Sequence, residues 1–130
     1  MTIFIDAIVP MYLLGAEHPN KSRVRVLLDE LTIADERFVT NTGVYQEVLH
    51  RYTRLARPDL VDAGFTLLDE LADELCAVDR SVLDRARQLV REGAGARDAV
   101  HAATMQANGI DRILTFDRGF DRLPGLQRIH

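Results

Sequence analysis

The sequence has almost no cysteine and no long apolar run. Cys76 is the only cysteine, which excludes an intramolecular disulfide and a cysteine-based metal site. It lies in residues 75–78, an apolar run that predicts a buried strand with Cys76 as a small core residue. No stretch approaches the roughly 18 apolar residues that a membrane-spanning helix needs. The apolar N-terminal segment lacks a basic region and is interrupted by Asp6, unlike a signal peptide. We therefore expect a cytoplasmic protein that does not bind membranes.

Lysine is also nearly absent, because Lys21 is the only one. The formal net charge is -4 and the pI about 5.5, an acidic balance that argues against nucleic-acid binding unless bound cations reverse the local charge. Arginine suits bidentate contact with phosphate. A GC-rich genome also explains an excess of arginine over lysine, and for the overall count we favour that explanation.

The length and pattern predict one domain over residues 1–130. Apolar residues make up 47% of the chain and charged residues 28%, as in ordinary globular proteins. Short apolar runs predict four strands, and a fifth edge strand is expected near the C-terminus: 3–5, 37–40, 75–78, 112–116 and 126–129. Helical periodicity fills the intervals, and no hairpin signal joins two strands. The predicted fold is α/β, a three-layer α/β/α sandwich with a parallel four- to five-stranded sheet.

Carboxylates stand where predicted strands give way to helices or loops. Asp6 follows the run 3–5, Glu47 lies beyond the second strand, Asp98 opens an alanine-rich helix, and Asp117 follows the fourth strand. The carboxyl ends of parallel strands meet at one edge of a sheet, so these acids should share a cleft. Acids in one cleft repel one another, and a hard divalent ion is the natural counter-charge. The set points to metal-assisted chemistry on a phosphate-containing substrate.

Each acid also has a purely structural explanation. Asp6 is equally suited to capping a helix, and Glu47 to the margin of a helix surface. Asp98 is favoured at a helix N-terminus by the dipole. Asp117 and Asp121 both suit loop capping, and Asp117 is the stronger candidate because it lies closer to the strand end.

Several other phosphate-handling folds are excluded. A Walker loop and a Gly-x-Gly-x-x-Gly fingerprint are absent. Phosphatases with an aspartyl nucleophile need a second aspartate two residues after the first, where this chain has Ile8. Receiver domains need a late lysine, but the only lysine here is Lys21.

Four segments carry a family resemblance: Phe4–Ala7, Tyr45–Leu49, Arg97–Ala103 and Leu114–Asp121. In order and spacing along the whole chain they resemble a PIN-domain ribonuclease, specifically the toxin of a VapBC-type toxin–antitoxin pair. Ile8 departs from the pattern, since relatives often have Asn or Ser there. Thr115 matches a polar residue often found before the last acid.

The resemblance implies a metal-dependent endoribonuclease that uses Mg²⁺ or Mn²⁺. It makes Asp6, Glu47 and Asp98 metal ligands, places the fourth acid at Asp117, and leaves Asp121 as an accessory ligand. Glu47 or Asp117 would orient the attacking water. His101, one turn after Asp98, is expected to be structural.

Arginines follow two of the acids. Arg51, Arg54 and Arg57 follow Glu47, and Arg118 and Arg122 follow Asp117. We assign RNA-phosphate contacts to Arg51 and Arg118, although solvated helix faces or intramolecular ion pairs explain such residues equally well.

The resemblance also implies partners. Such toxins form homodimers and are inhibited by an antitoxin that covers the active site and carries the DNA-binding portion. The chain itself has no helix-turn-helix pattern, so DNA contact would be indirect. The alternative is a catalytically silent RNA- or protein-binding module of the same fold, in which the acids form a structural network.

Overall fold

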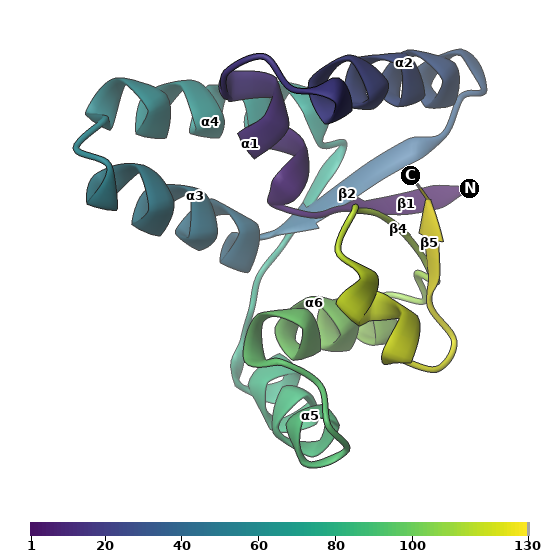
Figure 1. Cartoon of the computed structure of the whole chain (residues 1–130). Helices are drawn as coiled ribbons and strands as arrows, with labels where there is room; N and C mark the ends of the chain where they lie inside the picture. The colour runs from purple at the N-terminus through teal and green to yellow at the C-terminus, as the bar shows by residue number, and fades with distance from the viewer. Residues whose placement is uncertain (130) are drawn as a thin grey trace.

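The computed structural model describes residues 1–129 and contains, within them, one parallel five-stranded sheet (Figure 1). The strand order is β3-β2-β1-β4-β5, so β1 is central. The strands span Thr2–Ile5 (β1), Arg37–Asn41 (β2), Glu74–Cys76 (β3), Arg112–Leu114 (β4) and Gln127–Ile129 (β5). All four pairings are parallel. The predicted parallel sheet is confirmed, including its short fifth strand.

Helices cover both faces of this sheet (Figure 1). On one side lie α1 (Ile8–Leu14), α2 (Pro19–Ile33) and α4 (Pro58–Leu71). On the other lie α5 (Arg80–Arg91), α6 (Ala96–Ala107) and the 3-10 helix η1 (Arg118–Arg122). Helix α3 (Thr42–Arg54) packs against α4 and also contacts α6. The arrangement confirms the three-layer α/β/α sandwich, and none of the helices in residues 1–129 has the length and apolarity to cross a bilayer.

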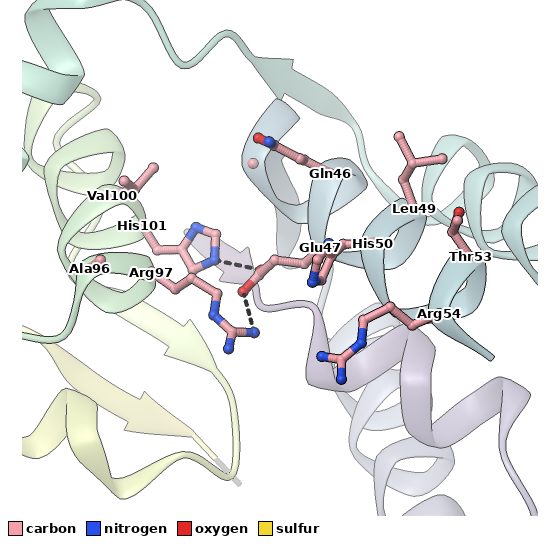
Figure 2. A pocket seen from close by; sticks show the side chains of 11 residues that line it. Gln46, Glu47, Leu49, His50, Thr53, Arg54, Ala96, Arg97, Val100 and His101 are labelled. Atoms are coloured by element: carbon pink, nitrogen blue, oxygen red, sulfur yellow. Dashed lines mark hydrogen bonds and ion pairs between the residues drawn. The ribbon is translucent and has the colours of Figure 1, made fainter.

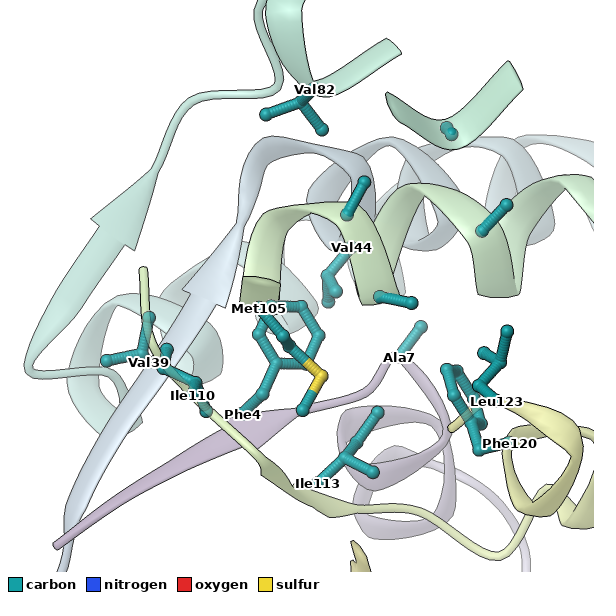
Figure 3. Close-up of a cluster of buried hydrophobic side chains, with 14 of the residues drawn as sticks. Phe4, Ala7, Val39, Val44, Val82, Met105, Ile110, Ile113, Phe120 and Leu123 are labelled. Carbon is teal, nitrogen blue, oxygen red and sulfur yellow. The ribbon is translucent and has the colours of Figure 1, made fainter. Parts of the chain in front are cut away.

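The central strand β1 is buried on both faces because its side chains alternate. Ile3 and Ile5 pack into the cluster that includes α1 and α2, whereas Phe4 points to the opposite face. There Phe4 meets Met105 of α6 and Ile113 of β4 (Figure 3). The predicted alanine-rich face of α6 is buried against the sheet, which lets this helix lie close to the strands.

The helix boundaries follow local capping chemistry. The Asn41 side chain accepts a hydrogen bond from the Val44 N–H at 2.9 Å and caps α3, and Asp79 caps α5 in the same way through Val82. Gly109, with φ of +65°, reverses the chain after α6. Asparagine and aspartate are preferred at helix N-caps, and glycine where the backbone turns left-handed after a helix.

The prediction of a buried third strand is wrong. Strand β3 is shorter than predicted and lies at the edge of the sheet, where it pairs only with β2. Leu75 is 49% exposed, and Cys76 is only half-buried. An apolar run does not distinguish a central strand from an edge strand, since only the sheet order decides which faces are covered.

The chain order creates a reversal point beside β1. From β1 the chain moves outward to β2 and β3, and then returns to place β4 on the other side of β1. In open parallel sheets, binding sites form at the carboxyl ends of the strands where this reversal occurs. Here those ends are Ile5 and Leu114, which are paired in register.

The close contact of α3 and α4 generates a stability prediction. A Cβ placed on Gly64 of α4 would lie 2.6 Å from Val48 Cγ1, a fully buried atom of α3. Alanine improves helix propensity by about 1 kcal/mol, but overpacking costs about 1–3 kcal/mol. Gly64→Ala should therefore lower the free energy of unfolding by up to about 2 kcal/mol, measured by urea denaturation.

Removing the clashing methyl groups provides the control. In a Val48→Ala background the same Gly64→Ala change should be neutral or stabilising, since the new Cβ then fills the vacated space. An increase in stability on Gly64→Ala alone would contradict the tight helix contact.

Candidate functional site

Asp6 is fixed directly after the central strand. Its Oδ1 accepts a hydrogen bond from the Ala7 N–H at 2.8 Å, and its Oδ2 accepts one from the Thr115 hydroxyl at 2.6 Å. Thr115 is fully buried after β4, and its Oγ1 also accepts from the Asp117 N–H at 3.1 Å. Thr115 therefore ties the first acid to the loop that carries the last one.

Glu47 projects from α3 towards α6. Its Oε2 lies 2.9 Å from Nε2 of His101, and its Oε1 lies 3.7 Å from Nη1 of Arg97 (Figure 2). His101 is buried, and its Nε2 also lies 3.7 Å from Asp6 Oδ1. Asp6, Glu47 and His101 thus offer potential ligand atoms within 4.8 Å of one another.

Asp98 and Asp117 converge on Gly119 of η1. Asp117 caps η1, since its Oδ1 accepts from the Gly119 N–H at 2.8 Å. A Cβ on Gly119 would lie 2.7 Å from Asp98 Oδ2 and 3.0 Å from Asp117 Oδ1. The absence of a side chain at this position lets both carboxylates approach the same point.

The predicted acids Asp6, Glu47, Asp98 and Asp117 all line one open depression of about 460 Å³. It lies at the reversal point, where β1 and β4 end. Ile8 also lines it, at the position where the family pattern often has Asn or Ser.

Asp121 is oriented differently from these four acids. Both of its oxygens accept hydrogen bonds from the Arg128 guanidinium, at 3.0 and 3.1 Å. This bidentate pair links η1 to β5, and Asp121 is not among the residues found to line the depression within residues 1–129.

The acids of the depression repel one another. Burial raises the pKa of Asp98 to about 6, and the charges of Asp117 and Asp6 add to the effect. Burial also raises the pKa of Asp6, against the opposing influence of His101 and the Thr115 hydrogen bond. The site therefore favours a bound cation or proton.

A second, more apolar hollow of about 730 Å³ adjoins the acids between α3 and α6 (Figure 2). Glu47, Arg97 and His101 border it, and Leu49, Thr53 and Val100 form part of its walls. Glu47, Ala96 and Arg97 border both hollows, so the two hollows lie next to each other.

The arginines predicted to contact RNA are exposed, and neither is among the described residues that line the depression. Arg118 follows Asp117 at the start of η1, and Arg51 lies on α3 one turn after Glu47. Arg57 instead pairs with Asp59. Arg54 and Arg97 line the hollow between α3 and α6, and the sequence pattern had not singled out Arg97.

Two buried polar residues at the site were not among the predicted site residues. His101 was expected to be structural, yet it contacts Glu47 and lies near Asp6. Asn41, whose side chain caps α3, also has its amide nitrogen 3.2 Å from His101 Nδ1. The spacing of His101 one turn after Asp98 was the only signal in the sequence that placed it on the acid-bearing face.

Comparison with known proteins gives a consistent result. The PIN domain model matches residues 3–126. Ribonuclease VapC13 of Mycobacterium tuberculosis is 39% identical over 129 residues, which cover 98% of both chains.

Solved structures agree on the fold. VapBC2 from Rickettsia felis, bound to a DNA fragment from its promoter, superimposes with a TM-score of 0.76 at 14% identity, covering 99% of this chain and 98% of that one. VapC20 of Mycobacterium tuberculosis, a Sarcin-Ricin loop cleaving toxin, gives 0.75 at 17% identity, with 94% and 95% covered. By the extent of these matches, the chain belongs to the PIN-domain family and, within it, to the group of the VapC ribonucleases.

Proposed function

We propose that this protein is a metal-dependent endoribonuclease and the toxin of a toxin–antitoxin pair. One observation carries the proposal: four carboxylates from separate parts of the chain line a single depression at the carboxyl end of a parallel sheet. The similarity to ribonuclease VapC13 supports RNA as the substrate.

The donor set fits a hard divalent cation, Mg²⁺ or Mn²⁺. Asp6, Glu47, Asp98 and Asp117 offer only carboxylate oxygens, the ligands these ions prefer. Burial, followed by the charges of Asp117 and Asp6, raises the pKa of Asp98, and a bound cation would offset both effects. We leave Asp121 out of the ligand set and assign it to anchoring η1, because its bidentate pair with Arg128 directs it to β5 and it is not among the described residues that line the depression.

Once bound, the ion would acidify water and stabilise charge on the phosphate. The protein's part is to hold its acids still before the substrate arrives. Asp6 is held by Thr115 and the Ala7 N–H, and Glu47 by His101. Glu47 or Asp117 would orient the attacking water, since each lies at the rim of the depression and Asp117 is exposed. No protein nucleophile is needed.

RNA affinity would come from arginines outside the acidic centre. We assign phosphate contacts to Arg118 and Arg51, whose exposed side chains lie on η1 and α3. Without these positive charges, the acids would repel the phosphate backbone of the RNA.

The partners that we propose are based on the solved structures that this chain resembles. One of these neighbours is a VapBC pair on promoter DNA, which supports an antitoxin partner for this chain and DNA contact through the complex. The hollow between α3 and α6 adjoins the acids and offers an inhibitory segment a place to bind. We also propose a homodimer that acts in the cytoplasm.

Substitution of Asp6 tests the nuclease directly. Asp6→Asn should reduce cleavage of total cellular RNA at least about 100-fold, equivalent to about 2.7 kcal/mol of barrier, since a fixed ligand is lost. Discrete products should appear with wild-type protein in Mg²⁺ or Mn²⁺ and disappear in EDTA.

Asp62→Asn on the exposed surface of α4 is the matched control and should cleave as wild type does. Asp121→Asn should also retain cleavage. If folded, antitoxin-free wild-type protein gives no metal-dependent products, the chain is a silent binding module instead.

Metal binding should also be visible in thermal stability. Mn²⁺ at 100 times its Kd should stabilise the protein by about 2.7 kcal/mol, a rise in Tm on the order of 10 °C. Asp98→Asn should raise the Tm of the metal-free protein, because it removes one of the repelling charges, and should weaken the Mn²⁺ response. A metal-free Tm that falls on Asp98→Asn would contradict the repulsion described above.

Arg118→Ala should weaken RNA binding without changing Mn²⁺ affinity. Loss of one phosphate contact should lower the salt dependence of log Kd by about 0.7 for single-stranded RNA. Fluorescence anisotropy in EDTA measures binding without cleavage, and Arg25→Ala on the exposed face of α2 serves as the control. Unchanged affinity in Arg118→Ala would remove Arg118 from the RNA-binding surface.

A further inference from the structure

We propose that Asn41 is a positioning residue that holds His101 in the tautomer with its proton on Nε2. His101 then donates to Glu47 and orients that carboxylate, and is not itself a metal ligand. The proposal rests on the role of Glu47 as a ligand in the proposed function.

The orientation of the Asn41 amide is fixed from two sides. This side chain is fully buried, and its Oδ1 accepts the Val44 N–H that begins α3, at 2.9 Å. Its Nδ2 lies 2.8 Å from the Thr104 hydroxyl, which itself donates to the Val100 carbonyl at 2.9 Å. Since the proton of Thr104 is already committed, its oxygen must accept from Asn41. Both contacts place the amide nitrogen, and not the oxygen, towards α6.

This orientation determines where the imidazole proton lies. The second N–H of the Asn41 amide is available to His101 Nδ1, 3.2 Å away. An amide nitrogen donates and does not accept, so Nδ1 must offer its lone pair. The ring proton of neutral His101 is therefore on Nε2.

The Nε2–H of His101 faces Glu47. It lies 2.9 Å from Glu47 Oε2 and farther, 3.7 Å, from Asp6 Oδ1. A nitrogen that carries a proton has no lone pair for a metal ion, and Nδ1 faces Asn41. His101 therefore lies among the potential ligands without being able to coordinate in this tautomer.

The hydrogen bond from His101 fixes the orientation of the Glu47 carboxylate. One oxygen is held by a buried donor, which leaves Oε1 directed towards Arg97 and the depression. The same amide that begins α3 also sets the donor that orients a side chain of α3. Partners of this kind typically change metal affinity by about 10- to 100-fold when removed.

Asn41→Asp separates the two roles of this residue. Aspartate has nearly the same shape and caps helices as well as asparagine, so the start of α3 is retained. It can only accept, so it should draw the ring proton to Nδ1. Nitrogen-15 NMR of the imidazoles in metal-free protein at alkaline pH, where the ring is neutral, reads the tautomer directly. Loss of the signal in His101→Gln assigns it.

We expect the wild-type spectrum to show His101 protonated at Nε2 only, and Asn41→Asp to show a proton on Nδ1. Mn²⁺ affinity, measured by calorimetry, should fall about 10- to 100-fold in Asn41→Asp. A wild-type proton on Nδ1, or an Asn41→Asp protein with unchanged spectrum and Mn²⁺ affinity, would falsify the proposal.

A second pair of variants does not depend on the folding of Asn41→Asp. The His101→Gln amide can still donate to Glu47, whereas His101→Leu cannot. Glutamine should keep Mn²⁺ affinity within a few-fold and leucine should lose about 10- to 100-fold. Equal losses in both variants would identify His101 as a ligand and overturn the proposal. Wild-type protein that binds no Mn²⁺ would instead refute the proposed function and leave the metal-free spectrum as the test of the tautomer.

Discussion

The mutual repulsion of four carboxylates is the constraint on which this structure depends. Two unit charges about 4 Å apart repel by about 4 kcal/mol at an effective dielectric constant of 20, and a whole domain is stable by only about 5–15 kcal/mol. The protein offsets this repulsion with neutral donors, among them Thr115 and the Ala7 N–H at Asp6. At Asp98, burial and the nearby charges of Asp117 and Asp6 still raise the pKa. Such a depression favours the binding of a cation.

Local capping and site assembly use the same residues. Asp117 caps η1 through one oxygen, and Asp6 uses one oxygen to accept its neighbour's N–H. From the sequence, capping and ligation were alternatives for both residues, but a carboxylate has two oxygens and several lone pairs. A hydrogen bond at one position of the group fixes its direction without exhausting its acceptor capacity. The same hydrogen bonds therefore stabilise the loop and orient the carboxylates towards a cation.

Interactions between residues that are close in the sequence can be predicted from it, whereas interactions between distant segments cannot. The cap at Asp79 and the reversal at Gly109 depend on neighbouring residues, so the residue type at each position already favours them. The exposure of β3 depends on sheet order and was predicted wrongly. The ranking of Asp117 above Asp121 rested on distance from the strand, whereas the feature that sets Asp121 apart is Arg128, on another strand. The contact of Asn41 with His101 joins β2 to α6 and has no signature in either segment.

An acidic centre also dictates where recognition must occur. A polyanion approaching Asp6 and its neighbours is repelled until a cation is in place, so affinity for the proposed RNA substrate would have to come from the rim. Arg97 lies at that rim, where its exposed guanidinium is 3.7 Å from Glu47 Oε1. His101 holds the other oxygen of the same carboxylate from the buried side. Glu47 thus stands between the buried imidazole of His101 and the exposed guanidinium of Arg97. The exposed guanidinium puts a positive charge beside the acids at the surface, whereas the buried imidazole holds Glu47 from the interior.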